Sequence, residues 1–324
     1  MDFKSTLRKV EVSFMKVVAF LGRKIVLAYG KTAQMCKKSG KKYFKTAAFA
    51  IVILYVIGAV VFGIRLYRQN RVEKIDRMAS YIYPFPVANT GRSLIFDKEM
   101  QQKTNWSKTF AGKMQMAVPE DISKRIVDDM VYDAVIMQEA SSMNIKVTKD
   151  DIEKTFSIAA SGIGGEDQAT TFVKDNYGMS IAKFKQLLVP KIALEKIRDG
   201  NFVKVKARHI VIKDEGRAKD ILKKAKEGAK FEDLAKDNSE DQSSKEEGGL
   251  LAGGEFLFRE TSGLPQEFED ALFKMKKGDI SELVKTDLGY HIIKVEEREG
   301  SIEETMTAWL DSLKKKYPTR VWFR

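Results

Sequence analysis

Hydrophobic and polar positions follow three different patterns along this chain, and the first is a continuous apolar run over 47–64. Its 18 uncharged residues come close to the roughly 20 that a helix needs to cross the hydrocarbon core of a bilayer. The apolar side chains lie all round such a helix, which argues against a buried helix of a soluble domain. A cleaved signal peptide is the alternative, but 46 residues precede the run and its end lacks a clean small-x-small cleavage site before Arg65. We therefore expect one transmembrane helix.

The second pattern covers 93–200, where apolar positions recur at helical spacing. It predicts amphipathic helices over 121–144 and 181–198, and Thr148 is placed to cap a helix that begins after it. This stretch holds no cluster of residue types that carry chemistry. Its apolar positions are typical of plain core, although a helical module with methionines could also hold unfolded chains.

After Gly200 the period changes to two, and the third pattern mixes strands with short helices. Together they predict a compact α+β domain over 203–298. A last helix over 302–316 carries Trp309 and must bury its apolar face elsewhere. The expected elements of the domain are strands over 202–213, 280–285 and 290–295 and helices over 216–226, 231–237 and 267–273.

Charge changes the picture because it is unevenly distributed. The net charge is +12, yet 1–77 hold 17 Lys and Arg against 4 Asp and Glu, so the remainder carries −1. A near-neutral folded part argues against a nucleic-acid partner and for a leader that faces a membrane. Residues 1–46 carry +10, which by the positive-inside tendency keeps the N-terminus cytoplasmic and places the later domains outside the cytoplasm. The leader is either a basic helix lying on an anionic membrane or a solvated tail.

Cysteine and histidine are scarce. Cys36 is the single cysteine, so no intramolecular disulfide and no CxxC zinc motif can form. His209 and His291 are the only histidines, too few for an ordinary histidine metal site. We predict that the protein uses no metal and no other cofactor, since no nucleotide-binding loop is present either.

Both histidines fall within a series of short motifs between 204 and 298. Any one of these motifs is weak evidence, whereas their order and spacing together make chance improbable. They are Ala207-Arg208-His209-Ile210-Val211, Phe231-Glu232-Asp233-Leu234-Ala235, Ser239-Glu240-Asp241, Gly248-Gly249-Leu250, Glu267-Phe268-Glu269-Asp270-Ala271-Leu272-Phe273, Gly278-Asp279-Ile280-Ser281, Val284-Lys285-Thr286 and Gly289-Tyr290-His291-Ile292-Ile293-Lys294-Val295.

With these motifs the segment resembles the parvulin-type peptidyl-prolyl cis/trans isomerases. The resemblance implies an α+β fold, a four-stranded antiparallel sheet with flanking helices, and a site that twists X-Pro bonds. It implies a catalytic polar network and an apolar slot for the proline ring. The network residues would be His209, Asp241, Thr286 and His291, and the substrate-binding residues of the slot Leu250, Leu264 and Phe268. The alternative is that the two histidines are core residues which merely hold strands together.

Two departures from the family pattern bear on specificity. Many relatives have a short loop between the glycine-rich turn and the slot, whereas this chain has about six extra residues between Leu250 and Leu264. The first strand is followed by 213–217 without a paired-arginine loop, so a phosphoserine-proline preference is not expected.

The flanking segments resemble the chaperone part of SurA-type foldases, in which the last helix returns to pack on the N-terminal module. We therefore expect a membrane-tethered isomerase and foldase that binds unfolded or newly exported polypeptides containing X-Pro bonds. A holdase with a parvulin fold and little activity is the alternative. The expected parts are a basic leader (1–46), a transmembrane helix (47–64), a linker (65–92), a helical chaperone-like domain (93–200), the parvulin domain (203–298) and a C-terminal helix and tail (301–324).

Overall fold

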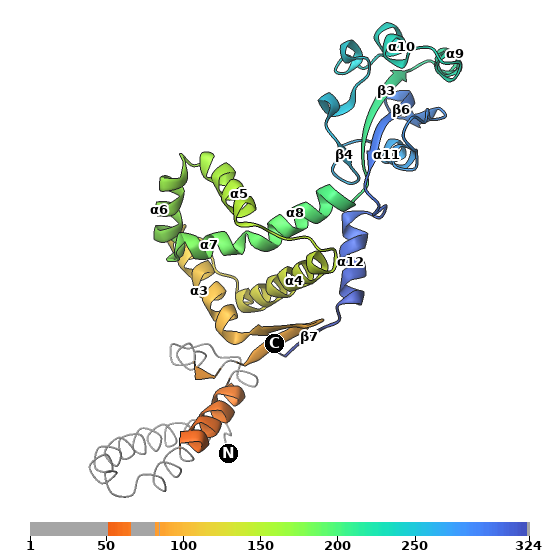
Figure 1. Cartoon of the computed structure of the whole chain (residues 1–324). Coiled ribbons are helices and arrows are strands. Elements are labelled where there is room, and N and C mark those ends of the chain that lie inside the picture. Colours follow the sequence, from red (N-terminus) through yellow and green to blue (C-terminus); the bar gives the residue numbers. More distant parts are fainter. Residues whose placement is uncertain (1–50, 66–81, 84, 323–324) are drawn as a thin grey trace, which may run out of the picture. The chain divides into compact units, whose positions relative to one another are not determined.

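The structure, a computed structural model, describes residues 51–65, 82–83 and 85–322 (Figure 1). The basic leader, residues 47–50 of the apolar run and residues 66–81 lie outside the described residues. The rest of the run belongs to a helix over 51–65. Within the described ranges, no helix has both the length and the apolar character needed to cross a membrane. The described chain divides into two compact units, the larger of which comprises Ala88–Ile95 and Lys103–Arg320.

The helices that follow agree in part with the sequence pattern. The capping box at Thr148 is confirmed, because its hydroxyl accepts from the backbone N–H of Asp151 and the Asp151 carboxylate accepts from the N–H of Thr148. The single helix over 181–198 is wrong: the chain breaks at Leu188, since Pro190 starts a new helix and has no N–H to continue the old one. The helices are α3 (Asp97–Lys113), α4 (Ile122–Ser142), α5 (Lys149–Ser161), α6 (Glu166–Tyr177), α7 (Ile181–Leu187) and α8 (Val189–Asn201).

Three short strands were missed by the sequence pattern. They are β1 (Pro86–Thr90), β2 (Ser93–Phe96) and β7 (Thr319–Val321), in the sheet order β2-β1-β7. Residues 86–92 are therefore not a plain linker, and the stretch from 93 does not begin as a helix. The hydroxyls of Thr90 and Thr319 lie 2.9 Å apart, so the start and the end of the larger unit meet here.

The last helix, α12 (Met306–Lys316), buries its apolar face against α4 and α8. Trp309 and Leu313 lie in one core cluster with Ile136 and Ile197. The buried carboxylate of Glu139 accepts from the Lys316 ammonium at 2.6 Å and from the Tyr317 hydroxyl at 2.8 Å. These contacts fix α12 on the helical region.

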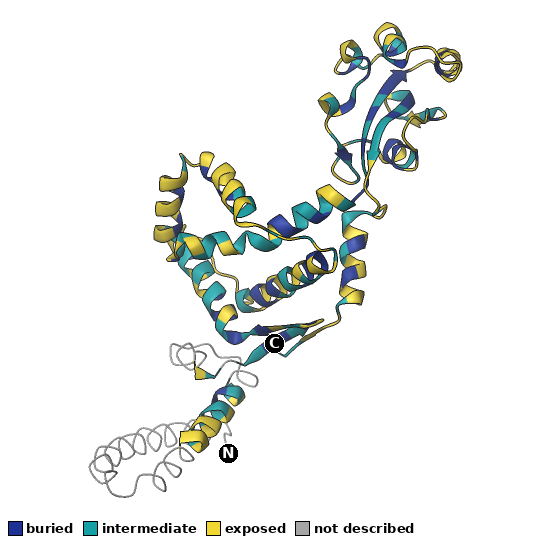
Figure 2. Ribbon diagram, viewed as in Figure 1, coloured by how far each residue is buried: buried dark blue, intermediate teal, exposed yellow. Residues whose placement is uncertain are grey.

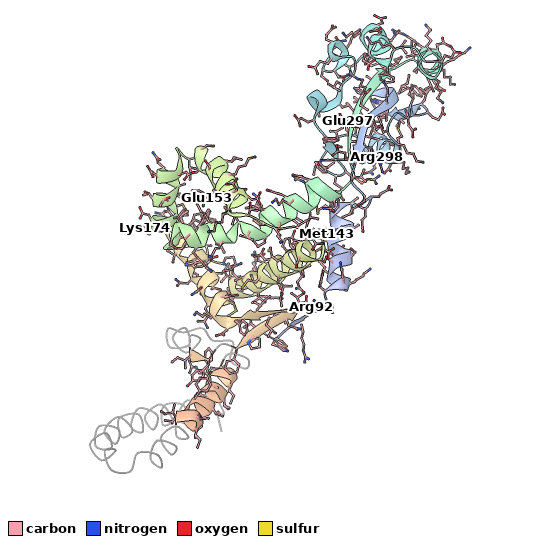
Figure 3. The ribbon with its side chains drawn as sticks, viewed as in Figure 1. Arg92, Met143, Glu153, Lys174, Glu297 and Arg298 are labelled. Atoms are coloured by element: carbon pink, nitrogen blue, oxygen red, sulfur yellow. The ribbon has the colours of Figure 1, made fainter. Side chains whose placement is uncertain are left out.

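Between α8 and α12 lies a sheet of four antiparallel strands in the order β4-β3-β6-β5, which confirms the α+β fold of this segment. Its strands alternate buried residues between two faces, and helices cover both (Figure 2). Near the end of β6, Arg298 donates to the backbone carbonyl of Phe273 at 3.0 Å (Figure 3). The strands are β3 (Lys204–Ile212), β4 (Leu257–Phe258), β5 (Val284–Thr286) and β6 (Gly289–Glu299), and the helices are α9 (Glu215–Lys226), α10 (Phe231–Asn238) and α11 (Gln266–Leu272).

Candidate active site

The two histidines come together on one face of the sheet. His209 on β3 is paired with Ile293 and Val211 with His291, so the histidines are diagonal neighbours on adjacent strands. Both are buried, and their rings stack with centroids 5.6 Å apart and an interplanar angle of 18°. Their Nδ1 atoms are 3.4 Å apart. Alternation within each strand, together with this register, puts both side chains on the same face.

A carboxylate binds Nε2 of His209, the ring nitrogen that does not face His291. Asp241 follows α10, and its Oδ2 lies 2.7 Å from His209 Nε2. Ser243 donates to Asp241 Oδ1 through its hydroxyl at 2.6 Å, and Ser244 donates to Oδ2 at 2.5 Å. Burial alone would raise the pKa of the Asp241 carboxyl, but hydrogen bonds from Ser243, Ser244 and His209 outweigh it and hold the pKa well below its usual range. Asp241 is therefore ionised at neutral pH.

A hydroxyl binds Nε2 of His291, the ring nitrogen that does not face His209. Thr286 Oγ1 on β5 lies 2.7 Å from His291 Nε2 and accepts from the backbone N–H of Leu288 at 3.1 Å. Burial, the largest cause, and the neighbouring His209 ring together lower the pKa of His291 to about 4 against the opposing effect of Asp241. His291 is thus neutral at physiological pH.

The ionised carboxylate fixes one end of the network. Because Asp241 only accepts, His209 carries a proton on Nε2 and donates it to the carboxylate. The Nδ1 atoms of the two histidines face each other, and His291 Nε2 shares a hydrogen bond with the Thr286 hydroxyl. The result is one continuous chain of polar contacts from the Leu288 N–H through Thr286 and both histidines to the carboxylate.

An aromatic ring closes the apolar side of this network. Phe268 on α11 is buried and meets both histidine rings edge-on, with centroids 5.7 Å from His209 and 5.2 Å from His291. Leu264 packs on the same cluster. Leu250 is half-buried and lies outside the cluster, whereas its neighbour Leu251 is buried in it, and the place of Leu250 in the slot stays a prediction.

The structure thus gathers the predicted network residues and adds some that the sequence analysis missed. Ser243 and Ser244 had a local signal, since an Asp side chain commonly accepts from the backbone N–H two residues on in an Asx turn, as Asp241 Oδ1 does here from Ser243 at 3.0 Å. Among the described residues, no group of three His, Cys, Asp or Glu side chains is placed to hold a metal ion.

Comparison with known proteins places the sheet segment. Residues 192–299 match the family described as PPIC-type PPIASE domain. Foldase protein PrsA 2 of Bacillus anthracis is 36% identical over 189 residues, which cover 54% of this chain and 64% of that protein. The chain therefore spans less than two thirds of the length of this relative.

Two further relatives extend the comparison. Foldase protein PrsA of Caldanaerobacter subterraneus subsp. tengcongensis is 31% identical over 225 residues, covering 65% of this chain and 70% of that protein. A crystal structure of the peptidylprolyl isomerase PrsA from Bacillus anthracis is 32% identical and covers 59% of this chain and 86% of that one, with a TM-score of 0.30.

Proposed function

The chain belongs to the family of PrsA foldases, and on that basis we propose that it is a peptidyl-prolyl cis/trans isomerase which acts on unfolded or newly exported polypeptides. One observation carries the proposal: a continuous chain of polar contacts through Thr286, His291 and His209 ends on ionised Asp241, beside the buried ring of Phe268. A polar network next to an apolar wall is what a twisting prolyl amide requires.

The physical reason lies in the amide bond. Resonance keeps an X-Pro bond planar behind a barrier of roughly 18–20 kcal/mol, so unaided rotation takes tens of seconds or more. At the twisted transition state the amide loses this resonance, its nitrogen becomes a better hydrogen-bond acceptor and its C–O dipole shrinks. A site with fixed polar groups and an apolar slot stabilises the twisted form more than the planar one. The reaction requires no covalent intermediate and no net proton transfer.

The decisive test is the isomerisation rate of a short X-Pro peptide with the purified full-length chain. We expect acceleration by the wild type and a loss of about a hundredfold in Asp241→Ala, as when one preorganised polar group is removed from an active site. Asp237→Ala, on the exposed side of α10, is the matched control and should retain the rate. Equal rates in all three would reject Asp241 as part of a catalytic network.

A holdase with a parvulin fold is the second candidate. It is favoured by the long segment between Leu250 and Leu264, which departs from the family pattern, and by exposed apolar residues of the helical region such as Ile158 and Phe172. Protection of unfolded protein from aggregation without any acceleration of isomerisation would select it. In both candidates the helical region grips clients in the manner of SurA-type chaperones, and nucleic acid is not a partner.

The proposal includes a single-span membrane anchor over 47–64, with the N-terminus in the cytoplasm and the later domains outside. The apolar run and the charge of +10 on 1–46 support it. Protease shaving of intact cells tests the orientation. Digestion of the region after Arg65 is the expected result. Full protection would mean that this region lies in the cytoplasm and that the proposed orientation is wrong.

A further inference from the structure

The loop that joins β4 to α11 lies in the segment that departs from the parvulin pattern. Two of its residues, Glu260 and Gly263, have positive φ values of 67° and 71°. Residues other than glycine rarely adopt this conformation, so the surrounding structure must hold Glu260 there. The loop ends at Leu264, which packs on the cluster that contains Phe268.

A buried carboxyl group holds this loop. Glu269 on α11 has only 6% of its surface exposed. Its Oε1 accepts from the hydroxyl of Ser262, and its Oε2 lies 3.4 Å from the backbone N–H of Glu260. The Ser262 oxygen in turn accepts from the backbone N–H of Leu264 at 3.1 Å. Two donors of the loop are thereby satisfied by one side chain.

The same helix therefore serves two purposes. Phe268 meets both histidine rings, while the adjacent Glu269 reaches the loop through Ser262. Consecutive residues of α11 connect the polar network to the position of Leu264. A shift of the loop would move Leu264 without disturbing the histidines.

We propose that Glu269 and Ser262 are positioning residues that set Leu264 as one wall of the proline slot and thereby determine the ring size that the slot accepts. The inference rests on the proposed isomerase function. Without the Ser262 hydroxyl, the Leu264 N–H loses its acceptor and Glu269 loses a donor, so the wall loosens. A looser slot discriminates less well between rings that differ by one methylene.

The test compares two peptides, one with proline and one with pipecolic acid, whose ring has one more methylene. In Ser262→Ala and in Glu269→Met we expect the ratio of kcat/KM values, prolyl over pipecolyl, to fall about fivefold, within the range that one methylene contributes in an apolar pocket. The loss should appear in KM more than in kcat. Because the two side chains share one hydrogen bond, the effect of the double variant should be smaller than the sum of the two single effects.

Three controls make the result interpretable. Ser262→Thr keeps the hydroxyl and should retain the ratio, as should Glu267→Gln on the exposed side of α11. Leu264→Ala should lower the ratio directly. A changed ratio in Leu264→Ala with none in Ser262→Ala and Glu269→Met overturns the proposal, and so does an unchanged ratio in Leu264→Ala.

A second readout keeps the inference separate from the proposed function. If the wild type shows no isomerase activity, the proposed function fails, and amide hydrogen exchange then decides the positioning role. Exchange at Leu264 should be at least about tenfold faster in Ser262→Ala than in Ser262→Thr, since the acceptor of its N–H is removed. Equal exchange in the two variants would overturn the positioning role, whatever the activity.

Discussion

The candidate active site and the α5–α6 pair differ in which kinds of side chain they bury and which they expose. The site buries polar groups, namely His209, His291, Ser244 and Glu269, and satisfies them with short hydrogen bonds. The α5–α6 pair buries few apolar residues and leaves large ones outside, including Ile158 at 65% and Ile163 at 52% exposure. A buried polar network specifies one geometry, whereas exposed apolar side chains suit partners of varied shape. The two regions are thus built for different kinds of recognition.

The largest effect should come from a pair of left-handed glycines, one in each region. A Cβ at Gly249 (φ +77°) would lie 2.1 Å from the His209 carbonyl oxygen, whereas at Gly178 (φ +65°) the nearest atom is 3.9 Å away. We expect Gly249→Ala to lower the free energy of unfolding by about 3 kcal/mol or more, and Gly178→Ala by about 1 kcal/mol. Urea unfolding measures both. Equal losses would mean that the site tolerates displacement as readily as the helices do.

Acid should affect the site next. The folded-state pKa of His291 is about 4, below its ordinary 6.5, so the unfolded chain binds more protons between these values. Stability is therefore fully present above pH 6.5 and is lost as the pH falls toward 4. We expect the free energy of unfolding to drop by about 1–2 kcal/mol between pH 6.5 and pH 5. In His291→Gln the free energy of unfolding should depend less on pH over this range. An unchanged dependence in that variant would assign the loss of stability to other groups.

The smallest effect on stability should come from the exposed residues of the α5–α6 pair. Ile158→Ser with Ile163→Ser should change the free energy of unfolding by no more than about 0.5 kcal/mol, because little area is uncovered. Suppression of the aggregation of an unfolded client should nevertheless weaken, and isomerisation of a short peptide should stay the same. Lys154→Ser, on the exposed side of α5, is the matched control. If suppression of aggregation is unaltered, these residues are not part of the client-binding surface.

Sequence reasoning reached the site through the motifs, whose resemblance to the parvulin family implied one network containing His209 and His291. The structure brings their Nδ1 atoms to 3.4 Å. Period-two alternation fixes which residues of one strand share a face, whereas the pairing of β3 with β6 determines which residues of the two strands meet. The role of Leu250 in the slot stays a prediction. The turn that follows it explains why Leu251 enters the buried cluster: Ala252 adopts φ +46°, and the chain there no longer alternates its side chains. Period-two alternation cannot tell which leucine is buried once the backbone leaves the strand.

The missed elements have different causes. Strands β1, β2 and β7 are three to five residues long, which is too short to show a clear period, and β7 pairs with β1 from more than 200 residues away. The break at Leu188 was readable, since Pro190 favours the first turn of a new helix. The contact of Glu269 with the loop could not be predicted from the sequence, because an acidic residue next to Phe268 is equally typical of an exposed helix face.

The hydrogen bonds at the entrance and exit of the sheet domain have a consequence for the order in which the protein matures. The Asn201 carbonyl accepts from the N–H groups of Ser301 and Ile302, so the domain leaves the helical region where it entered. Trp309 and Leu313, which complete the helical core, follow it in the chain. Because synthesis proceeds from the N-terminus and domains generally fold as units, the sheet domain can fold on a nascent chain while the helical core still lacks its last helix. The segment proposed to catalyse prolyl isomerisation is thus available before the segment proposed to grip clients is finished.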